Sequence, residues 1–249
     1  MAVSQRVLVL GATSAIAERW CRLRAARGDR LMLVARDPQR LAVIAADLKA
    51  RGAADVLTAD SDLGDPEGAA ERFAAFVDRL GGVELVLVAY GVLGDQAEAQ
   101  ADVGRLEQGL MTNFVSAAVW CELAAGVMET AGRGTLAAIS SVAGDRGRRS
   151  NYAYGAAKAG LSVFLEGLAH RFAGTPVTVV AVKPGFVDTP MTAHIAKGGP
   201  LWATPERVAE DIERAIAKRR PVIYTPWFWW VVMTIIRNLP RPVFNRMKI

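Results

Sequence analysis

The sequence predicts an α/β fold: a Rossmann-like, doubly wound parallel sheet with helices on both faces, in a single domain. Short apolar runs alternate with longer segments of helical period, and some runs, such as Leu85-Val86-Leu87-Val88, are apolar at every position. Strands that are covered on both faces have this composition in parallel sheets. Alternation of strands and helices at this spacing is typical of βαβ units with right-handed crossovers.

The individual elements follow from the apolar runs and from the residues at their boundaries. Three predicted helix starts, Asp37-Pro38, Asp65-Pro66 and Thr204-Pro205, each place an N-cap side chain before a proline. Gly28 and Gly52 stand where C-terminal caps are expected. The predicted strands are 7–10, 31–35, 83–89, 135–140, 177–182 and 222–224, and the predicted helices are 15–26, 38–51, 66–80, 103–130, 152–172 and 205–218. No linker divides residues 1–225, which we expect to form the domain, and residues 226–249 form an apolar and basic C-terminal tail.

The composition excludes several classes of protein. Of the 249 residues, 52% are hydrophobic and 22% are charged, so a disordered chain is excluded. A net charge of +5 suits a phosphate-bearing ligand or an anionic membrane surface, and it is too small to indicate nucleic acid. Cys21 and Cys121 lack metal-ligand spacing, and we expect buried free thiols in a reducing, cytoplasmic compartment. His170 and His194 have no companion ligands, so we expect no metal site.

The first strand is followed by a short turn that suits a dinucleotide. The segment Gly11-Ala12-Thr13-Ser14-Ala15-Ile16-Ala17 runs directly into a helix. In dinucleotide folds the backbone amides of such a turn, together with the N-terminus of the helix, bind the pyrophosphate. An ordinary strand–helix turn has the same pattern and is the alternative. The expected cofactor contacts are Gly11, Thr13, Ser14, Ala15 and Ile16.

The second strand leads into Arg36, which bears on the choice of cofactor. An acidic residue at this position bonds the ribose 2′-hydroxyl of NAD, whereas an arginine favours the 2′-phosphate of NADP. Asp37 is already assigned to a helix cap. We therefore expect NADP(H) to be preferred and NAD(H) to be accepted, and a solvated surface arginine is the alternative.

Tyr154 and Lys158 stand four residues apart in a predicted helix, so their side chains share one face. A free tyrosine has a pKa of about 10, and an adjacent ammonium lowers that pKa and makes the phenol a usable acid or base. Ser141 follows the strand 135–140 and offers a hydroxyl to a substrate oxygen. Taken singly, a tyrosine and a lysine at this spacing are usually a solvated pair. With the serine, they suit hydride exchange between a nicotinamide and a carbonyl carbon.

The pattern Ser141-(x12)-Tyr154-(x3)-Lys158 resembles the catalytic signature of the short-chain dehydrogenase/reductase family. The resemblance covers nearly the whole chain and implies an NAD(P)-dependent oxidoreductase. It implies that Asn113 supports a water-linked proton relay from Lys158. The turn departs from the family pattern at its two alanines, as does Tyr90, where a small residue is common. The further segments that carry the resemblance are the Gly11 turn, 88–91 and 183–189.

The same resemblance implies which residues touch the cofactor. Asp60 or Asp62 is expected beside the adenine, Gly91 near the adenine ribose and Thr189 at the nicotinamide carboxamide. The complete set of further expected contacts is Asp60, Asp62, Ala89, Gly91, Tyr154, Lys158, Pro184, Gly185, Val187 and Thr189.

Segments 88–95, 144–151, 191–194 and 239–244 are similar to one branch of this family. That branch reduces a 2-keto pentofuranosyl lipid phosphate, made by a partner flavin oxidase, in the epimerisation of decaprenylphosphoryl ribose. The likeness implies a polyprenyl-phosphate-linked substrate and a flavin oxidase as partner.

Four residues are candidates for contact with such a substrate. Arg146, Arg148 and Arg149 lie between the predicted serine and tyrosine, so we expect at least one of them to reach a substrate phosphate. Solvated loop arginines are the alternative. His194 lies where the family carries a mobile flap, and the resemblance implies contact with the sugar. An exposed loop histidine is the alternative there.

The C-terminal tail has the composition of a segment that lies on a membrane. Its uncharged stretch, Pro226 to Ile236, is 11 residues long, whereas a bilayer crossing needs about 20. The aromatic and apolar residues are followed by Arg237, Arg241, Arg246 and Lys248. This order suits a lipid interface, and we expect peripheral contact with the inner face of a membrane. Packing against the core or against a dimer partner is the alternative.

Two other functions fit parts of the pattern. A short-chain reductase of a small soluble ketone or alcohol fits every core motif and leaves the tail as an oligomer contact. A non-catalytic dinucleotide sensor typically lacks the tyrosine or the lysine, and both are present here. By analogy with the family, we expect a homo-oligomer formed through the predicted long helices 103–130 and 152–172.

Overall fold

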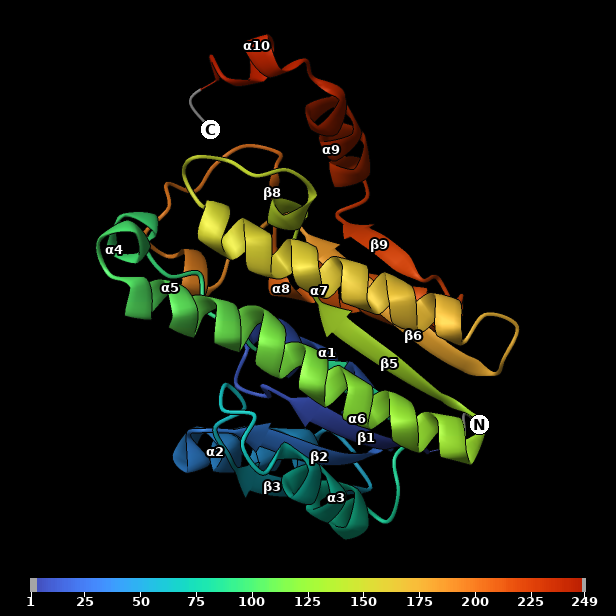
Figure 1. The fold of residues 1–249 in the computed structure, drawn as a ribbon. Helices are drawn as coiled ribbons and strands as arrows, with labels where there is room; N and C mark the ends of the chain where they lie inside the picture. The colour runs from blue at the N-terminus through green and yellow to red at the C-terminus, as the bar shows by residue number, and fades with distance from the viewer. Residues whose placement is uncertain (1–3, 248–249) are drawn as a thin grey trace.

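The protein is a three-layer α/β domain in which one parallel sheet lies between two layers of helices (Figure 1). The computed structural model describes residues 4–247. The sheet order is β3-β2-β1-β4-β5-β6-β9, and every neighbouring pair is parallel. This confirms the predicted fold, and the order reverses between β1 and β4, where such sheets bind ligands. The strands are β1 (Arg6–Leu10), β2 (Arg30–Ala35), β3 (Asp55–Asp60), β4 (Leu85–Val88), β5 (Gly134–Ile139), β6 (Val177–Pro184) and β9 (Val222–Thr225).

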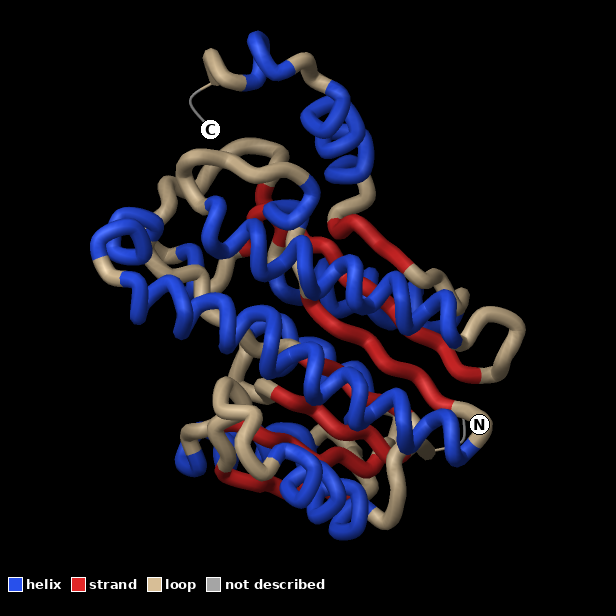
Figure 2. The backbone as a smooth tube through the Cα atoms, in the orientation of Figure 1, coloured by secondary structure: helices blue, strands red, loops and turns tan. Residues whose placement is uncertain are grey.

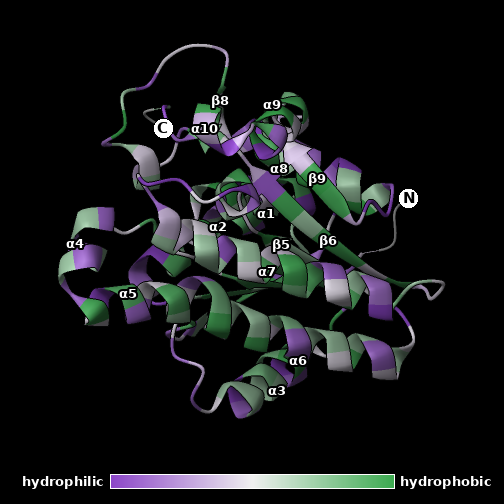
Figure 3. Ribbon diagram, turned by 45° about the horizontal axis from the view of Figure 1, so that its top comes forward, coloured by the Kyte–Doolittle hydropathy of each residue, from purple (hydrophilic) through white to green (hydrophobic). Residues whose placement is uncertain are grey.

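The alternation of side chains along each strand builds two hydrophobic cores. Val7 and Val9 of β1 face one core, whereas Leu8 and Leu10 face the other. The helices α1 (Ala15–Ala25), α2 (Pro38–Ala50) and α8 (Pro205–Ala217) cover the first face. The helices α3 (Ala69–Leu80), α6 (Ser116–Ala131) and α7 (Tyr152–Arg171) cover the second. Figures 2 and 3 show this layering, with hydrophobic and hydrophilic residues mixed on α3, α6 and α7, as expected of helices with one buried face.

The predicted long helix is continuous but changes its winding. It begins as α5 (Val103–Leu110), passes through a π-helical turn η1 (Met111–Val115) and continues as α6. Within the described residues, this helix has the length and hydropathy of a bilayer span. Trp120 and Cys121 on it are fully buried in the second core, so in this fold it serves as a layer helix.

The structure departs from the sequence predictions at several elements. Strand β3 was missing from the predicted runs because its Thr58 and Asp60 positions are polar at the sheet edge. Helix α3 begins at Ala69 rather than at Pro66, since Asp65 accepts the Glu67 amide in a separate turn. The caps at Asp37 and Thr204 are confirmed, because each side chain accepts the amide three residues later. A short helix α4 (Gln96–Ala101) also precedes α5.

The C-terminal tail folds into two helices, α9 (Phe228–Asn238) and α10 (Arg241–Phe244), which we call the C-terminal arm. The arm projects from one end of the molecule beyond β9 (Figure 1). Trp229 and Met233 are buried in a small third cluster with Val142. The small sheet of β7 (Phe186–Val187) and β8 (Trp202–Ala203) lies beside this cluster through Phe186. Lys248 of the predicted tail lies outside the described residues.

Candidate active site

The residues predicted to be catalytic meet at the carboxyl ends of the central strands. Ser141 follows β5 and caps the short helix η2 (Val142–Asp145), where its hydroxyl accepts the Ala143 amide at 3.1 Å. Tyr154 and Lys158 lie on the first turns of α7, and Asn113 lies in the π-helical turn. The carboxyl edge of a doubly wound sheet is where ligands bind in this architecture.

Tyr154 and Lys158 are neighbours on one face of α7. The Lys158 Nζ lies 5.9 Å from the centroid of the Tyr154 ring. Only 3% of Lys158 is exposed, and its Nζ donates to the Ile139 carbonyl at 3.0 Å. Burial lowers the pKa of the Lys158 ammonium to about 8. Lys158 can therefore gain or lose its charge near neutral pH.

The state of the Tyr154 phenol differs from the sequence prediction. The sequence predicts that the lysine lowers the tyrosine pKa, whereas burial raises the pKa of Tyr154, and hydrogen bonding to Ser141 offsets part of the rise. The reason is geometric, because the ammonium lies over the ring and donates to a backbone carbonyl. A phenol that stays protonated is ready to act as an acid, which suits reduction of a carbonyl.

Asn113 is fixed by three hydrogen bonds to the backbone. Its Oδ1 accepts the Val92 amide at 2.9 Å, and its Nδ2 donates to the carbonyls of Val92 and Gly109 at 2.8 and 3.0 Å. A Cβ on Gly91 would lie 2.6 Å from the Asn113 Oδ1 and 3.5 Å from the Lys158 Nζ. Glycine is therefore required at 91, and the Asn113 and Lys158 side chains face the same point. Turns of π-helix occur frequently at functional sites, and this one places Asn113.

The close fit of η2 against α7 was not found in the sequence. Ser140 is buried, and its hydroxyl donates to the Lys158 carbonyl at 2.9 Å. A Cβ on Gly144 would lie 2.6 Å from the Ala159 amide nitrogen, and one on Gly155 would lie 3.0 Å from the Ala143 carbonyl. Gly144 and Gly155, which stand close to Ser141 and Tyr154 in the sequence, are the residues that could have predicted this close packing. They let the segment that carries the serine approach the helix that carries the tyrosine.

The turn after β1 has the geometry of a phosphate site. Gly11 has a φ of +91°, and a Cβ there would lie 2.7 Å from the Tyr90 amide and Cβ. Ser14 is the N-cap of α1, yet its side chain makes no capping bond. Thr13, Ser14 and Ala15 are partly exposed, so these residues can contact a pyrophosphate. Ile16 is 8% exposed, and its side chain belongs to the core.

The unusual Tyr90 is accommodated in the second core. Its hydroxyl shares a hydrogen bond of 2.9 Å with Ser116, and its ring packs against the buried residues. Ala89, which comes before it, donates its amide to the Leu10 carbonyl at 2.8 Å and is buried. The larger side chain therefore points away from the crevice side of the turn, into the protein.

The residues expected near the adenosine lie at the ends of β2 and β3. Arg36 is exposed, and within residues 4–247 no hydrogen bond or ion pair engages it. Asp37 is occupied, because its carboxylate caps α2 through the Arg40 amide at 2.9 Å. Asp60 is exposed at the end of β3. The Asp62 carboxylate is partly committed to a local turn through the Gly64 amide at 2.9 Å.

The segment after β6 is shaped by contact with the arm. A Cβ on Gly185 would lie 1.9 Å from the Trp229 ring, so only glycine fits beneath that indole. The Gly185 amide donates to the Thr225 carbonyl at 3.1 Å. The Val187 carbonyl accepts from the Thr192 hydroxyl at 2.6 Å. Pro184 is buried, and the Thr189 side chain lies near Thr192 in the short helix η3 (Pro190–Thr192) that follows β7.

The three loop arginines have different environments. Arg146 donates to the carbonyls of Ile236, Arg237 and Leu239, and its guanidinium lies 3.7 Å from the Phe244 ring centroid. It is thus engaged by the arm rather than directed to a substrate phosphate, because carbonyls at the C-terminal end of a helix can accept further hydrogen bonds.

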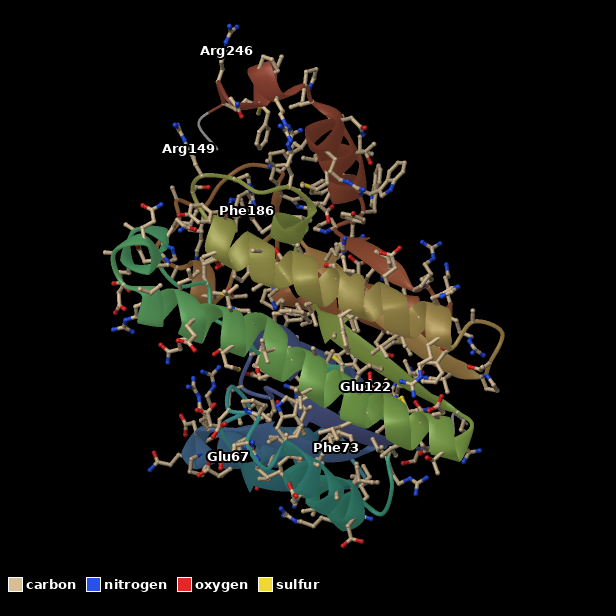
Figure 4. The ribbon with its side chains drawn as sticks, in the orientation of Figure 1. Glu67, Phe73, Glu122, Arg149, Phe186 and Arg246 are labelled. Atoms are coloured by element: carbon tan, nitrogen blue, oxygen red, sulfur yellow. The ribbon has the colours of Figure 1, made fainter. Side chains whose placement is uncertain are left out.

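Arg148 and Arg149 keep their guanidinium groups free of the arm. Arg148 is half-buried, burial lowers its pKa, and its Nε finds no partner among the described residues. Arg149 is exposed and extends from the loop (Figure 4). His194 is also exposed, in the segment after Thr192. An anionic ligand would therefore find Arg148 and Arg149 available.

A second polar cluster lies behind the serine segment and was not anticipated. The Asp145 carboxylate accepts from the Lys183 Nζ at 2.7 Å and from the Tyr224 hydroxyl at 2.6 Å. The side chain of Asp145 is only 2% exposed. A buried charge is retained where it is paired and hydrogen-bonded. The cluster therefore ties η2 to β6 and β9.

Both cysteines and His170 lie on the layer helices. Cys21 and Cys121 are buried free thiols in α1 and α6, as predicted, and burial raises the pKa of each. Among residues 4–247, no group of three or more His, Cys, Asp or Glu side chains could hold a metal ion. His170 lies exposed in the last turn of α7.

The sequence and the fold are similar to those of known oxidoreductases. Residues 5–199 match the family model described as short chain dehydrogenase. An uncharacterised oxidoreductase of Mycobacterium tuberculosis is 39% identical over 241 residues, which are 97% of this chain and 96% of that protein. A 3-oxoacyl-[acyl-carrier-protein] reductase of Bos taurus is 30% identical over 187 residues, 75% of this chain and 77% of that one.

A solved structure supports the fold in the same way. A variant of actinorhodin polyketide ketoreductase, solved with NADPH, superposes with a TM-score of 0.81 at 24% identity, covering 92% of this chain and 99% of that one.

Proposed function

The chain belongs to the short-chain dehydrogenase/reductase family, and we propose that it uses NADPH to reduce a 2-keto pentose carried on a polyprenyl phosphate. As a member of this family it is an oxidoreductase that binds NAD(P)(H). The observation that carries the catalytic assignment is the grouping of Ser141, Tyr154 and Lys158 at the carboxyl edge of the sheet.

The mechanism follows from the protonation states of these side chains. When bound, the nicotinamide supplies the hydride. The Ser141 hydroxyl donates a hydrogen bond to the carbonyl oxygen, and the Tyr154 hydroxyl transfers its proton to the same oxygen as negative charge develops there. Burial keeps that phenol protonated before the transfer. The Lys158 ammonium over the ring then stabilises the phenolate until Tyr154 is reprotonated.

The preference for NADP(H) rests on Arg36. The side chain is exposed at the end of β2. The Asp37 carboxylate accepts the Arg40 amide as the N-cap of α2, so it is not free to bind the ribose hydroxyls. A guanidinium forms charge-assisted hydrogen bonds with a phosphate, each worth about 1.5–3 kcal/mol. Arg36 would therefore favour the 2′-phosphate.

A phosphorylated substrate is supported by the arginines of the serine–tyrosine loop. The Arg148 Nε is buried without a partner among the described residues, and a phosphate oxygen would satisfy it. Arg149 adds an exposed positive charge at the same loop. A flavin oxidase is then the expected source of the ketone, and the cytoplasmic side of a membrane is the expected place of reaction.

The second candidate is a soluble ketone. It is favoured by the engagement of Arg146 with the arm, which leaves two rather than three arginines for a phosphate. One relative is named as a 3-oxoacyl-[acyl-carrier-protein] reductase. The homo-oligomer expected from the family remains a proposal for either substrate. It is supported by an apolar groove on α6, lined in part by Val119, Leu123 and Val127.

Kinetics with both classes of substrate test the proposal. NADPH oxidation would be followed with a micelle-dispersed polyprenylphosphoryl 2-keto pentose and with soluble ketones, including 3-oxoacyl thioesters. We expect a higher kcat/KM for the lipid-linked ketone, and Arg148→Ala should reduce kcat/KM for that substrate alone. Tyr154→Phe serves as the control and should abolish turnover of every substrate while it retains NADPH binding. Turnover of soluble ketones only would refute the lipid-linked assignment and leave the reductase chemistry standing.

A further inference from the structure

The outer face of α9 exposes large apolar side chains on a folded helix. We define this face by Trp227, Trp230, Val231 and Ile235, of which Trp227 is 68%, Trp230 59% and Ile235 59% exposed. The steps from Trp227 to Trp230 and Val231, and from Val231 to Ile235, are three or four residues, which places these side chains on one side of the helix. The opposite side is buried through Trp229 and Met233. A helix that is apolar on all sides is normally buried on all sides, so the outer face calls for a partner.

The arm is rigidly seated, so the exposure of this face is a fixed feature of the fold. Trp229 stacks against Gly185 and its Nε1 donates to the Leu201 carbonyl at 3.3 Å. Arg146 holds the far end of α9 through three carbonyls. Phe186 contacts the Trp229 ring edge-on with a centroid distance of 5.6 Å. The buried contacts therefore direct Trp227, Trp230 and Ile235 outward.

The charge of the arm indicates an anionic partner. Residues 226–249 contain four basic residues and no acidic residue, so they hold four of the five excess positive charges of the chain. The exposed Arg237, Arg241 and Arg246 follow the outer face along the chain. Figure 4 places Arg246 and Arg149 at the same end of the molecule, both extended from the backbone. A symmetric contact between two copies would bring like charges together, which disfavours self-association through this face.

We propose that the outer face of α9 and the arginines beside it dock the protein on an anionic lipid bilayer. Tryptophan is enriched at bilayer interfaces, and basic side chains contribute about 1 kcal/mol each near an anionic surface. The arm contacts the Gly185 segment and η2, which border the candidate active site. Docking would therefore present the carboxyl edge of the sheet to the membrane. This inference does not depend on the substrate, since membrane binding is measured without turnover.

Flotation of the full chain with vesicles tests the docking surface. We expect the protein to float with vesicles of phosphatidylcholine and phosphatidylglycerol, to bind pure phosphatidylcholine weakly, and to dissociate as the salt concentration rises. Trp230→Ser combined with Ile235→Ser should weaken binding to anionic vesicles by at least about tenfold. Arg241→Gln with Arg246→Gln should flatten the salt dependence. The matched control is Val43→Ser, because Val43 is 71% exposed on α2.

Each contrary result has a distinct meaning. No binding of the wild-type chain to anionic vesicles at low salt would overturn the proposal. Equal binding by the arm variants and the wild type would also overturn it, because another surface would then be responsible. If the variants convert a dimer into a monomer in light scattering while vesicles bind neither form, the face is a contact between copies. Tyr154→Phe should float like the wild type, so failure of the reductase assignment remains distinguishable.

Discussion

The candidate active site around Ser141, Tyr154 and Lys158, which we call the crevice, and the C-terminal arm are stabilised by different kinds of contact. In the crevice, polar groups from segments close in the chain meet: Ser140, directly after β5, donates a hydrogen bond to the Lys158 carbonyl in α7. In the arm, the contacts join residues that are farther apart in the chain, from 28 positions between Leu201 and Trp229 to 90 between Arg146 and Ile236. The crevice is lined by polar groups such as Ser141 and Lys158, whereas the arm rests on Trp229 and leaves an apolar face exposed. The difference shows that residues close in the chain can form the candidate active site, whereas contacts between distant residues determine the position of the arm beside it.

The two regions nevertheless share a border. Val142, the residue after Ser141, lies in one buried cluster with Trp229 and Met233. Asp145 and Arg146, at the end of the same short helix, bind β9 and the arm. Variants can therefore show whether the arm only rests on the crevice or also holds the serine segment in place.

Trp229→Ala is expected to have the largest effect on stability. Removing this buried tryptophan from the inner side of the arm should lower the free energy of unfolding by about 3–5 kcal/mol. Trp230→Ala on the next position is the matched control, because Trp230 is exposed and should change stability by less than about 0.5 kcal/mol. Denaturant titration of both variants measures the difference. Similar losses at the two positions would mean that the arm is not seated as described.

Lys158→Met should separate function from stability within the crevice. Turnover should fall by at least about 100-fold, because the stabilising cation is lost. Folding should instead become more favourable at pH 7, because burial lowers the Lys158 pKa from 10.5 to about 8. Such a shift corresponds to a destabilisation of the folded state by about 3 kcal/mol. This destabilisation is fully present below pH 8, and it disappears as the pH rises toward the lysine pKa of the unfolded chain.

The pH dependence of that variant distinguishes this account from a simple packing effect. Unfolding free energies of wild type and Lys158→Met would be compared from pH 7 to about pH 10. The advantage of the variant should shrink over this range, since the wild-type lysine is neutral in the folded state above its pKa. A gap that is constant with pH would contradict the assigned cause.

The sequence predicted the crevice more completely than the arm. Ser141 follows β5, and Tyr154 and Lys158 lie on the first turns of α7. Their positions therefore depend on a short stretch of chain, and the sequence spacing is enough to predict them. The direction of the Tyr154 pKa was wrong, because burial depends on the whole fold. The strand β3 escaped prediction because polar residues are tolerated at a sheet edge.

The position of the arm could not be derived from spacing. A glycine at the end of a strand can serve a turn, a bulge or a close contact, and the sequence does not distinguish these roles. Only the folded chain shows that Trp229 lies against Gly185. Arg146 is one of three arginines in one loop, and its sequence context does not distinguish it from Arg148 or Arg149. Its partners are backbone carbonyls at the end of α9, which have no signature in the sequence.

Arg146→Ala tests the border between the two regions. Loss of charge-assisted bonds to the α9 carbonyls and of the contact with Phe244 should lower the free energy of unfolding by about 2 kcal/mol. Arg149→Ala, in the same loop, should leave stability nearly unchanged because Arg149 is exposed. Hydrogen exchange of α9 amides provides the local readout and should accelerate only in Arg146→Ala. Unchanged protection in that variant would show that Trp229 alone seats the arm.

Arg36→Ala should give the smallest effect, because Arg36 follows β2, far from the arm along the strand order, and has no contact to lose within the described residues. The side chain is exposed and unengaged within the described residues, so its removal should leave stability unaltered within about 0.5 kcal/mol. The ratio of kcat/KM for NADPH to that for NADH should fall by about tenfold, or 1.4 kcal/mol, because only the 2′-phosphate loses a contact. Arg40→Ala is the comparison, since Arg40 lies one helical turn away and is paired with Glu18 at 3.8 Å. If Arg40→Ala changed the ratio and Arg36→Ala did not, the 2′-phosphate would be bound by a residue of α2. The assignment of NADP(H) from the arginine at the end of β2 would then be wrong for this chain.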